Sequence, residues 1–193
     1  MDREFKMIPK IRIKMPEKED TEKWNCLNLG CGKQQIADTK DMTWINIDKS
    51  PQVNPNMVFD LEQGLPWLQH KIIDYDKIDM IFINHFLEHV SNPLFLLAQC
   101  WMALKVDGCI HITVPNGADI LHPGHKSFFS AMWFTLLDPE HGEHHEIKDL
   151  VGDCAFIIEN HNVRGVNWKF KNVSKNGEEL TIVLKKVGEK NEG

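Results

Sequence analysis

Short apolar runs that end in polar residues dominate the first two thirds of the chain. Runs of this kind predict buried strands of a parallel sheet. Five of them precede residue 116, at 26–29, 44–47, 57–59, 78–83 and 109–114. Two further runs predict strands at 155–159 and 180–185, and Asn176-Gly177 before the last run is typical of a hairpin turn. We therefore expect an antiparallel strand pair at the end of the sheet.

Helical periodicity is clearest after Asn92-Pro93, where asparagine is a good N-cap and proline is favoured at the first helical position. Apolar residues then recur at helical spacing up to Leu104. A second helix is predicted over 127–138. The short stretch between Gly32 and the second strand leaves room only for a short helix, which we place at 33–37.

This alternation of strands and helices predicts an α/β fold. We expect a Rossmann-like, mostly parallel seven-stranded sheet with helices on both faces and an antiparallel C-terminal strand pair. The predicted domain organisation is an N-terminal arm over 1–22, one domain over 23–188 and a flexible tail over 189–193. The arm carries one short alternating stretch, at 11–14, which indicates an arm or an edge strand.

Composition narrows the class of protein. The chain has 193 residues and a net charge of −6, which argues against nucleic-acid and membrane partners. No apolar run is long enough to span a membrane, and no apolar segment of a signal peptide follows the N-terminus. The five cysteines form no C-x-x-C pair, so we expect a reducing, cytoplasmic location.

Candidate chemistry follows the carboxyl ends of the predicted strands, where open α/β sheets bind ligands. The glycine turn Gly30-Cys31-Gly32 follows the first strand, and its glycines let a ligand approach the backbone. The amides that open the predicted helix behind it can hold a carboxylate. Asp48 after the second strand can accept both hydrogen bonds from a ribose diol, and Asp60 after the third can bind an adenine amino group.

In this order the segments resemble the class I S-adenosylmethionine-dependent methyltransferases, and most of all a compact branch with a shortened first crossover. The resemblance spans roughly residues 24–140 and rests on 27–32, 44–48, 59–61 with 65–67, 84–90, 104–108 and 113–116. It implies S-adenosylmethionine as cofactor and methyl transfer as activity. Two positions depart from the pattern of many members: Asn28 replaces an acidic residue, and Gln34 replaces a third glycine.

The resemblance also implies roles for individual residues. The methionine end of the cofactor would lie against the turn, and Asp48 would hold the ribose. Asp60 and Leu61 would contact the adenine. The segment that begins at Asn84 would pass under the methionine portion. The complete predicted cofactor site is Leu29, Gly30, Cys31, Gly32, Asp48, Asp60, Leu61, Asn84 and His85.

The histidines allow a competing interpretation. The segment 85–89 fits the inverted zincin pattern H-x-x-E-H, but it starts directly at the end of a strand, so we expect one helical turn beside the cofactor and no metal site. His89, His122 and His125 are candidate general bases for an acceptor hydroxyl or amine. Mid-strand His111 is expected to be a core histidine with satisfied hydrogen bonds. Whether the cluster at 141–146 binds a metal stays open.

Three functions remain at this stage. The first is methyl transfer to a small-molecule or sugar-like acceptor, with the oligomeric state undetermined. The second is a catalytically silent, methyltransferase-like binding or regulatory protein. The third is a nicotinamide-dependent oxidoreductase, because Gly30-x-Gly32 followed by Asp48 partly fits a dinucleotide fingerprint. That fingerprint requires a third glycine where the chain has Gln35.

Overall fold

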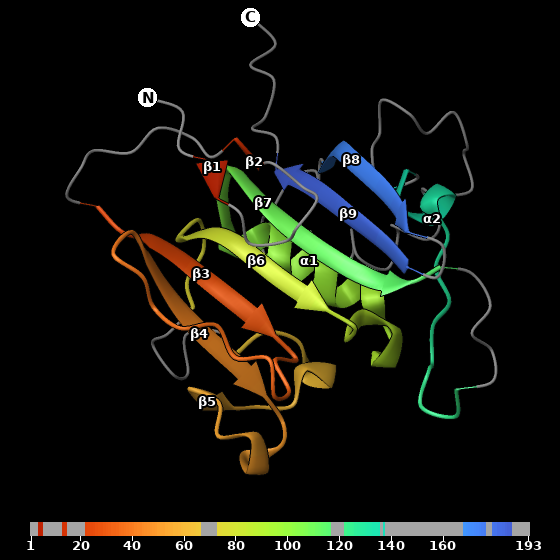
Figure 1. The fold of residues 1–193 in the computed structure, drawn as a ribbon, viewed down its shortest axis with the longest axis horizontal. Helices are drawn as coiled ribbons and strands as arrows, with labels where there is room; N and C mark the ends of the chain where they lie inside the picture. The colour runs from red at the N-terminus through yellow and green to blue at the C-terminus, as the bar shows by residue number, and fades with distance from the viewer. Residues whose placement is uncertain are drawn as a thin grey trace, which may run out of the picture.

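One mixed sheet organises the chain (Figure 1). The computed structural model describes residues 4–5, 13–14, 22–66, 73–116, 122–135, 137, 168–176 and 179–186. The strands of the main sheet lie in the order β5-β4-β3-β6-β7-β9-β8. Their bounds are β3 Trp24–Leu29, β4 Met42–Asp48, β5 Met57–Val58, β6 Ile78–Asn84, β7 Leu104–Pro115, β8 Trp168–Asn176 and β9 Glu179–Lys186.

Strand direction divides the sheet into two parts. Strands β5, β4, β3, β6 and β7 pair in parallel, whereas β9 pairs antiparallel with both β7 and β8. Strand β8 ends at Asn176 and β9 begins at Glu179, where the hairpin turn was predicted. The Rossmann-like α/β sheet with an antiparallel C-terminal pair is thus confirmed.

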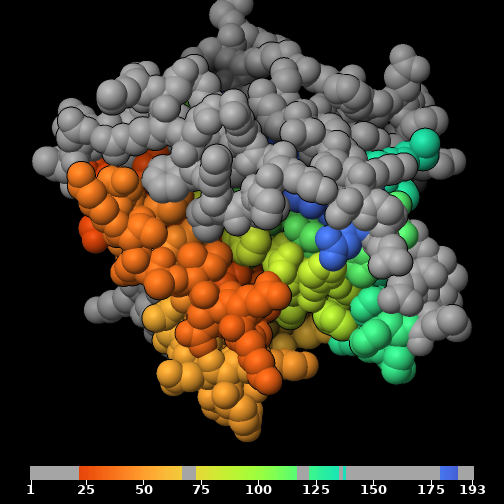
Figure 2. Space-filling model, in the orientation of Figure 1, coloured from red at the N-terminus to blue at the C-terminus, as the bar shows by residue number. Residues whose placement is uncertain are grey.

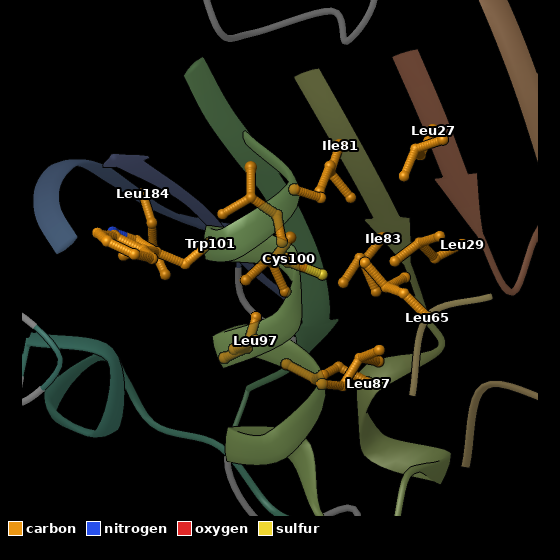
Figure 3. Packing of buried hydrophobic residues seen from close by; sticks show 14 of the residues in the cluster. Leu27, Leu29, Leu65, Ile81, Ile83, Leu87, Leu97, Cys100, Trp101 and Leu184 are labelled. Atoms are coloured by element: carbon orange, nitrogen blue, oxygen red, sulfur yellow. The ribbon is translucent and has the colours of Figure 1, made fainter. Parts of the chain in front are cut away.

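Helix α1 (Pro93–Ala103) covers one face of the sheet. It begins where the sequence predicted, because the Asn92 side chain caps it by accepting a hydrogen bond from the Phe95 amide at 3.0 Å. Leu97 and Cys100 of this helix are 1% and 0% exposed, and the Cys100 side chain points toward the strands (Figure 3). They join the main apolar core with the inward residues of β3, β6, β7 and β9, so α1 fixes the sheet that positions the strand ends.

The opposite face carries a second apolar cluster, formed by Trp24, Cys26, Met42, Trp44, Met80, Cys109 and Val183. No helix of the described ranges contributes to this cluster. The prediction of helices on both faces is therefore confirmed only for the face under α1.

His111 on β7 is 1% exposed. Burial lowers its pKa to about 4, and neither ring nitrogen has a hydrogen-bond partner within the described ranges. The expectation that its hydrogen bonds are satisfied was wrong for the described residues, where both ring nitrogens are buried without a partner.

The link between β3 and β4 is not helical, so the helix predicted at 33–37 was wrong. Two buried asparagines bind the backbone of this link. The Asn28 side chain donates to the Gln34 carbonyl, and the Asn46 side chain bonds both the amide and the carbonyl of Ile36, all at 2.8–2.9 Å. Asn28 also donates to Asn46 at 2.9 Å. Side-chain amides thus take the backbone groups that a helix would have paired.

The helix predicted over 127–138 is shorter than expected. Helix α2 spans Ala131–Thr135, and residues 127–130 are not helical. The Ser127 amide donates instead to the Glu88 carbonyl at 3.1 Å, and the Ser127 hydroxyl donates to the Val90 carbonyl. These bonds hold the segment against residues 88–90, which follow β6, and the helix starts only after Ser130, whose hydroxyl accepts from the Trp133 amide.

Other expectations concern the ends of the chain. The short strands β1 (Glu4–Phe5) and β2 (Ile13–Lys14) pair antiparallel in a small sheet of their own, so the described part of the N-terminal arm does not join the main sheet. The strand predicted at 155–159 and the tail at 189–193 lie outside the described residues. Within the described ranges, no helix is long and apolar enough to cross a membrane.

Candidate functional site

Three neighbouring parallel strands end at the same edge of the sheet (Figure 1). In their register, Leu29 of β3 lies opposite both Ile47 of β4 and Ile83 of β6. The segments that follow these strands therefore lie side by side. They carry the turn 30–32 and Asp48, which the sequence analysis placed in one site.

The glycine turn needs its glycines for two different reasons. Gly30 and Gly32 both have left-handed backbones, with φ of 62° and 49°. A Cβ atom on Gly30 would lie 2.1 Å from the Phe86 ring, so Gly30 is required for packing. A Cβ atom on Gly32 would have no atom of the described residues within 4 Å, so in this part of the structure Gly32 borders open space. The turn therefore has a packed side and an open side.

Alanine substitutions should separate these two glycines. Gly32→Ala is expected to cost about 1–2 kcal/mol of folding free energy, because only the left-handed backbone opposes it. Gly30→Ala is expected to cost at least about 2 kcal/mol more, since the Phe86 ring must also move. Urea unfolding of the two variants measures the difference. Equal losses in the two variants would contradict this assignment.

Asp48 at the end of β4 fixes the turn from the neighbouring strand. Its Oδ2 accepts from the Gly32 amide at 2.9 Å, and its Oδ1 accepts from the Ser50 amide at 2.8 Å. Each carboxylate oxygen has two lone pairs, so both oxygens can accept a further hydrogen bond. Asp48 can therefore hold the loop and also receive a diol from a ligand.

Leu29 and Cys31 line the turn from inside. Leu29 is fully buried, and Cys31 is 5% exposed. Burial raises the pKa of the Cys31 thiol, and the negative charge of Asp48 raises it further. Cys31 therefore stays a neutral thiol near pH 7, and its amide donates to the Ile47 carbonyl at 3.1 Å.

Asp60 and Leu61 follow β5 and begin the short 3-10 helix η2 (Leu61–Gln63). The Asp60 carboxylate caps this helix by accepting from the Glu62 amide at 3.2 Å. Leu61 is 2% exposed and packs in the main core. Of these two predicted adenine contacts, Asp60 keeps oxygen lone pairs for a ligand, whereas the Leu61 side chain belongs mainly to the core.

Asn84 ends β6 beside the glycine turn, and His85 follows it. The Asn84 side chain donates to Gln34 Oε1 at 2.6 Å, which links the end of β6 to the segment after the turn. The His85 backbone is left-handed, with a φ of 49°, and its amide donates to the Thr113 carbonyl of β7. This bend directs the following segment out of the sheet.

The His85 ring lies between two carboxylates. Its Nε2 is 3.0 Å from Glu179 Oε1, and its Nδ1 is 3.5 Å from Glu88 Oε1. The hydrogen bond with Glu88 raises the pKa of His85, and the charge of Glu179 acts in the same direction. An imidazolium is thus favoured at this corner of the site.

The three predicted base candidates come together. The rings of His122 and His125 stack with centroids 4.3 Å apart, and the His89 ring lies 5.0 Å from that of His125 and 6.0 Å from that of His122. His89 belongs to the one-turn 3-10 helix η4 (Leu87–His89), as the single helical turn predicted there requires. The cluster 141–146 lies outside the described residues.

Two contacts of Lys126 fasten the segment 122–130 to the 3-10 helices η4 and η2. The Lys126 amide donates to the Glu88 carbonyl at 2.7 Å, and the Lys126 ammonium forms an ion pair with Glu62. Glu62 also accepts from the Ser91 amide at 3.0 Å, and its bond with Lys126 helps to lower its pKa. Figure 2 shows the teal surface of this segment beside the yellow-green surface that follows β6.

Comparison with known proteins identifies the fold. No family model matches the chain. A methyltransferase of Archaeoglobus fulgidus that depends on S-adenosylmethionine aligns over 86% of this chain and 88% of its own, with 18% identity and a TM-score of 0.51. The DszA carbon methyltransferase aligns over 90% of this chain and 50% of its own, with 12% identity and a TM-score of 0.54. This chain has the methyltransferase fold.

A curated relative is similar over a short segment. The ubiquinone biosynthesis O-methyltransferase of Glaesserella parasuis serovar 5 (strain SH0165) is 42% identical over 48 residues. That segment covers 25% of this chain and 20% of the relative. Similarity to this methyltransferase is therefore local, whereas the fold is shared along most of the chain.

Within this methyltransferase fold, the sequence did not single out Gln34, Glu88 or Glu179 as site residues. Gln34 was noted only as a missing glycine, and Glu88 only as part of a zincin pattern. Glu179 lies far along the chain, but β9 is antiparallel to β7 and pairs Glu179 with Pro115. The first residue of β9 thus reaches the carboxyl edge, a placement that only strand pairing reveals.

Proposed function

We propose that the chain binds S-adenosylmethionine at the carboxyl edge of β3, β4 and β6 and transfers its methyl group to an acceptor. One observation carries the proposal: the Asp48 carboxylate bonds the Gly32 amide where the turn borders open space. An acceptor of hydroxyl hydrogen bonds thus lies next to a backbone that a ligand can approach. The fold shared with methyltransferases supports the same conclusion.

The residues of the edge fit this cofactor. Asp48 would hold the ribose hydroxyls, and Asp60 would accept from the adenine amino group, with Leu61 packed beneath it. Gly30, Cys31 and Gly32, backed by Leu29, would contact the methionine end, and Asn84 and His85 would lie under it. The open space at Gly32 leaves room for such a ligand, since even a Cβ atom there would meet nothing within 4 Å.

The histidine cluster, formed by His89, His122 and His125, would bind the acceptor. The bound cofactor supplies an electrophilic sulfonium methyl group. An imidazole of His89, His122 or His125 would take the proton of an acceptor hydroxyl. The oxygen would then form its bond to the methyl carbon while the carbon–sulfur bond breaks and its electrons stay on sulfur. The chain's main task is to hold the acceptor in line with that bond.

We propose that the acceptor is a small molecule with a hydroxyl group. We also propose that the protein acts in the cytoplasm. The locally similar relative is named as an O-methyltransferase, which supports an oxygen acceptor. Four described cysteines, Cys26, Cys31, Cys100 and Cys109, are free thiols, as is usual in a reducing compartment. We also propose that the seven strands described above make up the complete main sheet.

Calorimetry tests the proposal directly. S-adenosylmethionine and S-adenosylhomocysteine are each expected to bind one site per chain with micromolar affinity. If neither bound at millimolar concentration, the proposal would be wrong. Transfer of a labelled methyl group across a panel of hydroxylated acceptors then tests catalysis. Tight cofactor binding without any turnover would favour the catalytically silent alternative.

A further inference from the structure

Glu88 is a buried carboxylate with an oxygen that nothing satisfies. The residue is 2% exposed, and its Oε2 has no hydrogen-bond partner among the residues that the structure describes. Its Oε1 lies 3.5 Å from His85 Nδ1. An unpaired, buried carboxylate oxygen destabilises the fold. A positively charged or hydrogen-bonding group at this oxygen would therefore be stabilising.

Two imidazoles of the histidine cluster face the same point. One carboxylate oxygen of Glu88, one ring nitrogen of His89 and one of His125 all lie within 4.8 Å of one another. Glu88 is buried, whereas the two histidines are half-buried, so the group is reachable from one side. Two histidines and one carboxylate with an open side form the ligand set of catalytic zinc sites.

Hydrogen bonds fix which ring nitrogens can bind a cation. His89 Nδ1 lies 2.8 Å from the Gly124 carbonyl, to which it must donate. Its Nε2 therefore carries the lone pair, the arrangement that usually orients histidine ligands. His122 Nδ1, in contrast, accepts from the Gly124 amide at 3.3 Å. The neutral His122 ring then carries its proton on Nε2, which leaves His122 outside the ligand set.

We propose that Glu88, His89 and His125 bind one divalent transition-metal cation, with zinc as the best match. Imidazole ligands favour zinc over magnesium or calcium, and one carboxylate adds a single negative charge. Zinc ligands in a tetrahedral site lie about 3.3 Å apart, so small side-chain rotations must close the set. The cation would supply the partner that Glu88 Oε2 lacks.

This site differs from the H-x-x-E-H pattern in the sequence. That pattern would use His85 and His89 on one long helix, whereas His85 here lies between Glu88 and Glu179. The third ligand, His125, comes from a segment that the sequence does not place near η4. The metal site was therefore not predicted, and its ligands combine residues of two separate segments.

A cation here would give the acceptor an alternative to an imidazole base. Bound to the open position, an acceptor hydroxyl would lose its proton more easily. This role rests on the proposed methyl transfer, whereas binding of the cation does not. His89 and His125 cannot be both ligands and bases, so with a cation bound the activation of the acceptor hydroxyl would fall to the cation.

Metal titration of the untagged, chelator-treated full chain tests the site. Calorimetry with Zn²⁺ alone is expected to show one equivalent that is lost, or weakened at least about a hundredfold, in Glu88→Gln, His89→Asn and His125→Asn. Co²⁺ should give visible absorption bands that vanish in the same variants. Glu62→Gln is the matched control, because Glu62 holds the same segment through Lys126 but lies outside the ligand set; it should keep the equivalent.

Two results would overturn the proposal. One is the absence of any Zn²⁺ equivalent in the unmodified chain, and the other is an equivalent that survives all three ligand variants. If circular dichroism shows that Glu88→Gln does not fold, the test rests on His125→Asn, because His125 is only half-buried. Binding of S-adenosylhomocysteine, measured on the same samples, separates this outcome from failure of the proposed function.

Discussion

Asp48→Ala is expected to weaken binding of S-adenosylmethionine by about a hundredfold or more. The substitution removes the proposed ribose acceptor, and it also releases the Gly32 and Ser50 amides that the carboxylate holds at 2.9 and 2.8 Å. Hydrogen bonds to a charged group contribute about 1.5–3 kcal/mol each, so loss of the ribose contacts alone accounts for this change. Calorimetry with the cofactor measures it.

Asp38→Asn is the matched control for this experiment. Asp38 also accepts a hydrogen bond from a β4 amide, that of Trp44 at 2.7 Å, but near the other end of the strand. This variant should bind the cofactor with unchanged affinity. An Asp48→Ala variant that remains folded and binds within threefold of the unmodified chain would show that Asp48 does not hold the ribose.

Acidification is expected to destabilise the protein through His111. Burial lowers the pKa of this residue from 6.5 to about 4, which corresponds to about 3 kcal/mol. The unfolded chain binds the proton near pH 6.5, but the folded chain only near pH 4. Between these values the unfolded state binds more protons, so stability falls as pH falls. Above pH 6.5 the contribution does not change.

Two substitutions separate the charge of His111 from its polarity. His111→Leu should remove this part of the acid sensitivity, and it should raise stability near pH 7 by about 1–3 kcal/mol because two unpaired ring nitrogens disappear. His111→Gln should also remove the acid sensitivity but, being polar, should give no such gain. Urea unfolding at several pH values measures both effects. An unchanged pH slope in His111→Leu would contradict the prediction.

The features that the sequence predicted well are local. Asn92 and Pro93 mark the first residue of α1, because one caps the helix and the other begins it. Asn176 with its following glycine marks the hairpin before β9. The turn at 30–32 and Asp48 meet because parallel strands end at one edge, a general property of the fold. Short-range signals and one topological rule were thus enough to predict that the turn and Asp48 lie together at this edge of the sheet.

The features that the sequence did not predict depend on distant partners. Strand β8 is rich in polar residues and shows no apolar run, so only its pairing with β9 reveals it. Glu179 reaches the site through the register of β9 against β7. The approach of His125 to Glu88 depends on the amide of Lys126, which bonds the Glu88 carbonyl. No local pattern contains such contacts.

The non-helical link after β3 changes how the cofactor would be recognised. Without a helix there, no helix dipole faces the amino-acid end of the ligand, and such a dipole is worth about 1 kcal/mol. The amides of Cys31 and Gly32 already donate within the protein. Most of the affinity would then reside in the nucleoside half, and a nucleoside thioether that lacks the amino acid would compete almost as well as the complete methyl-transfer product.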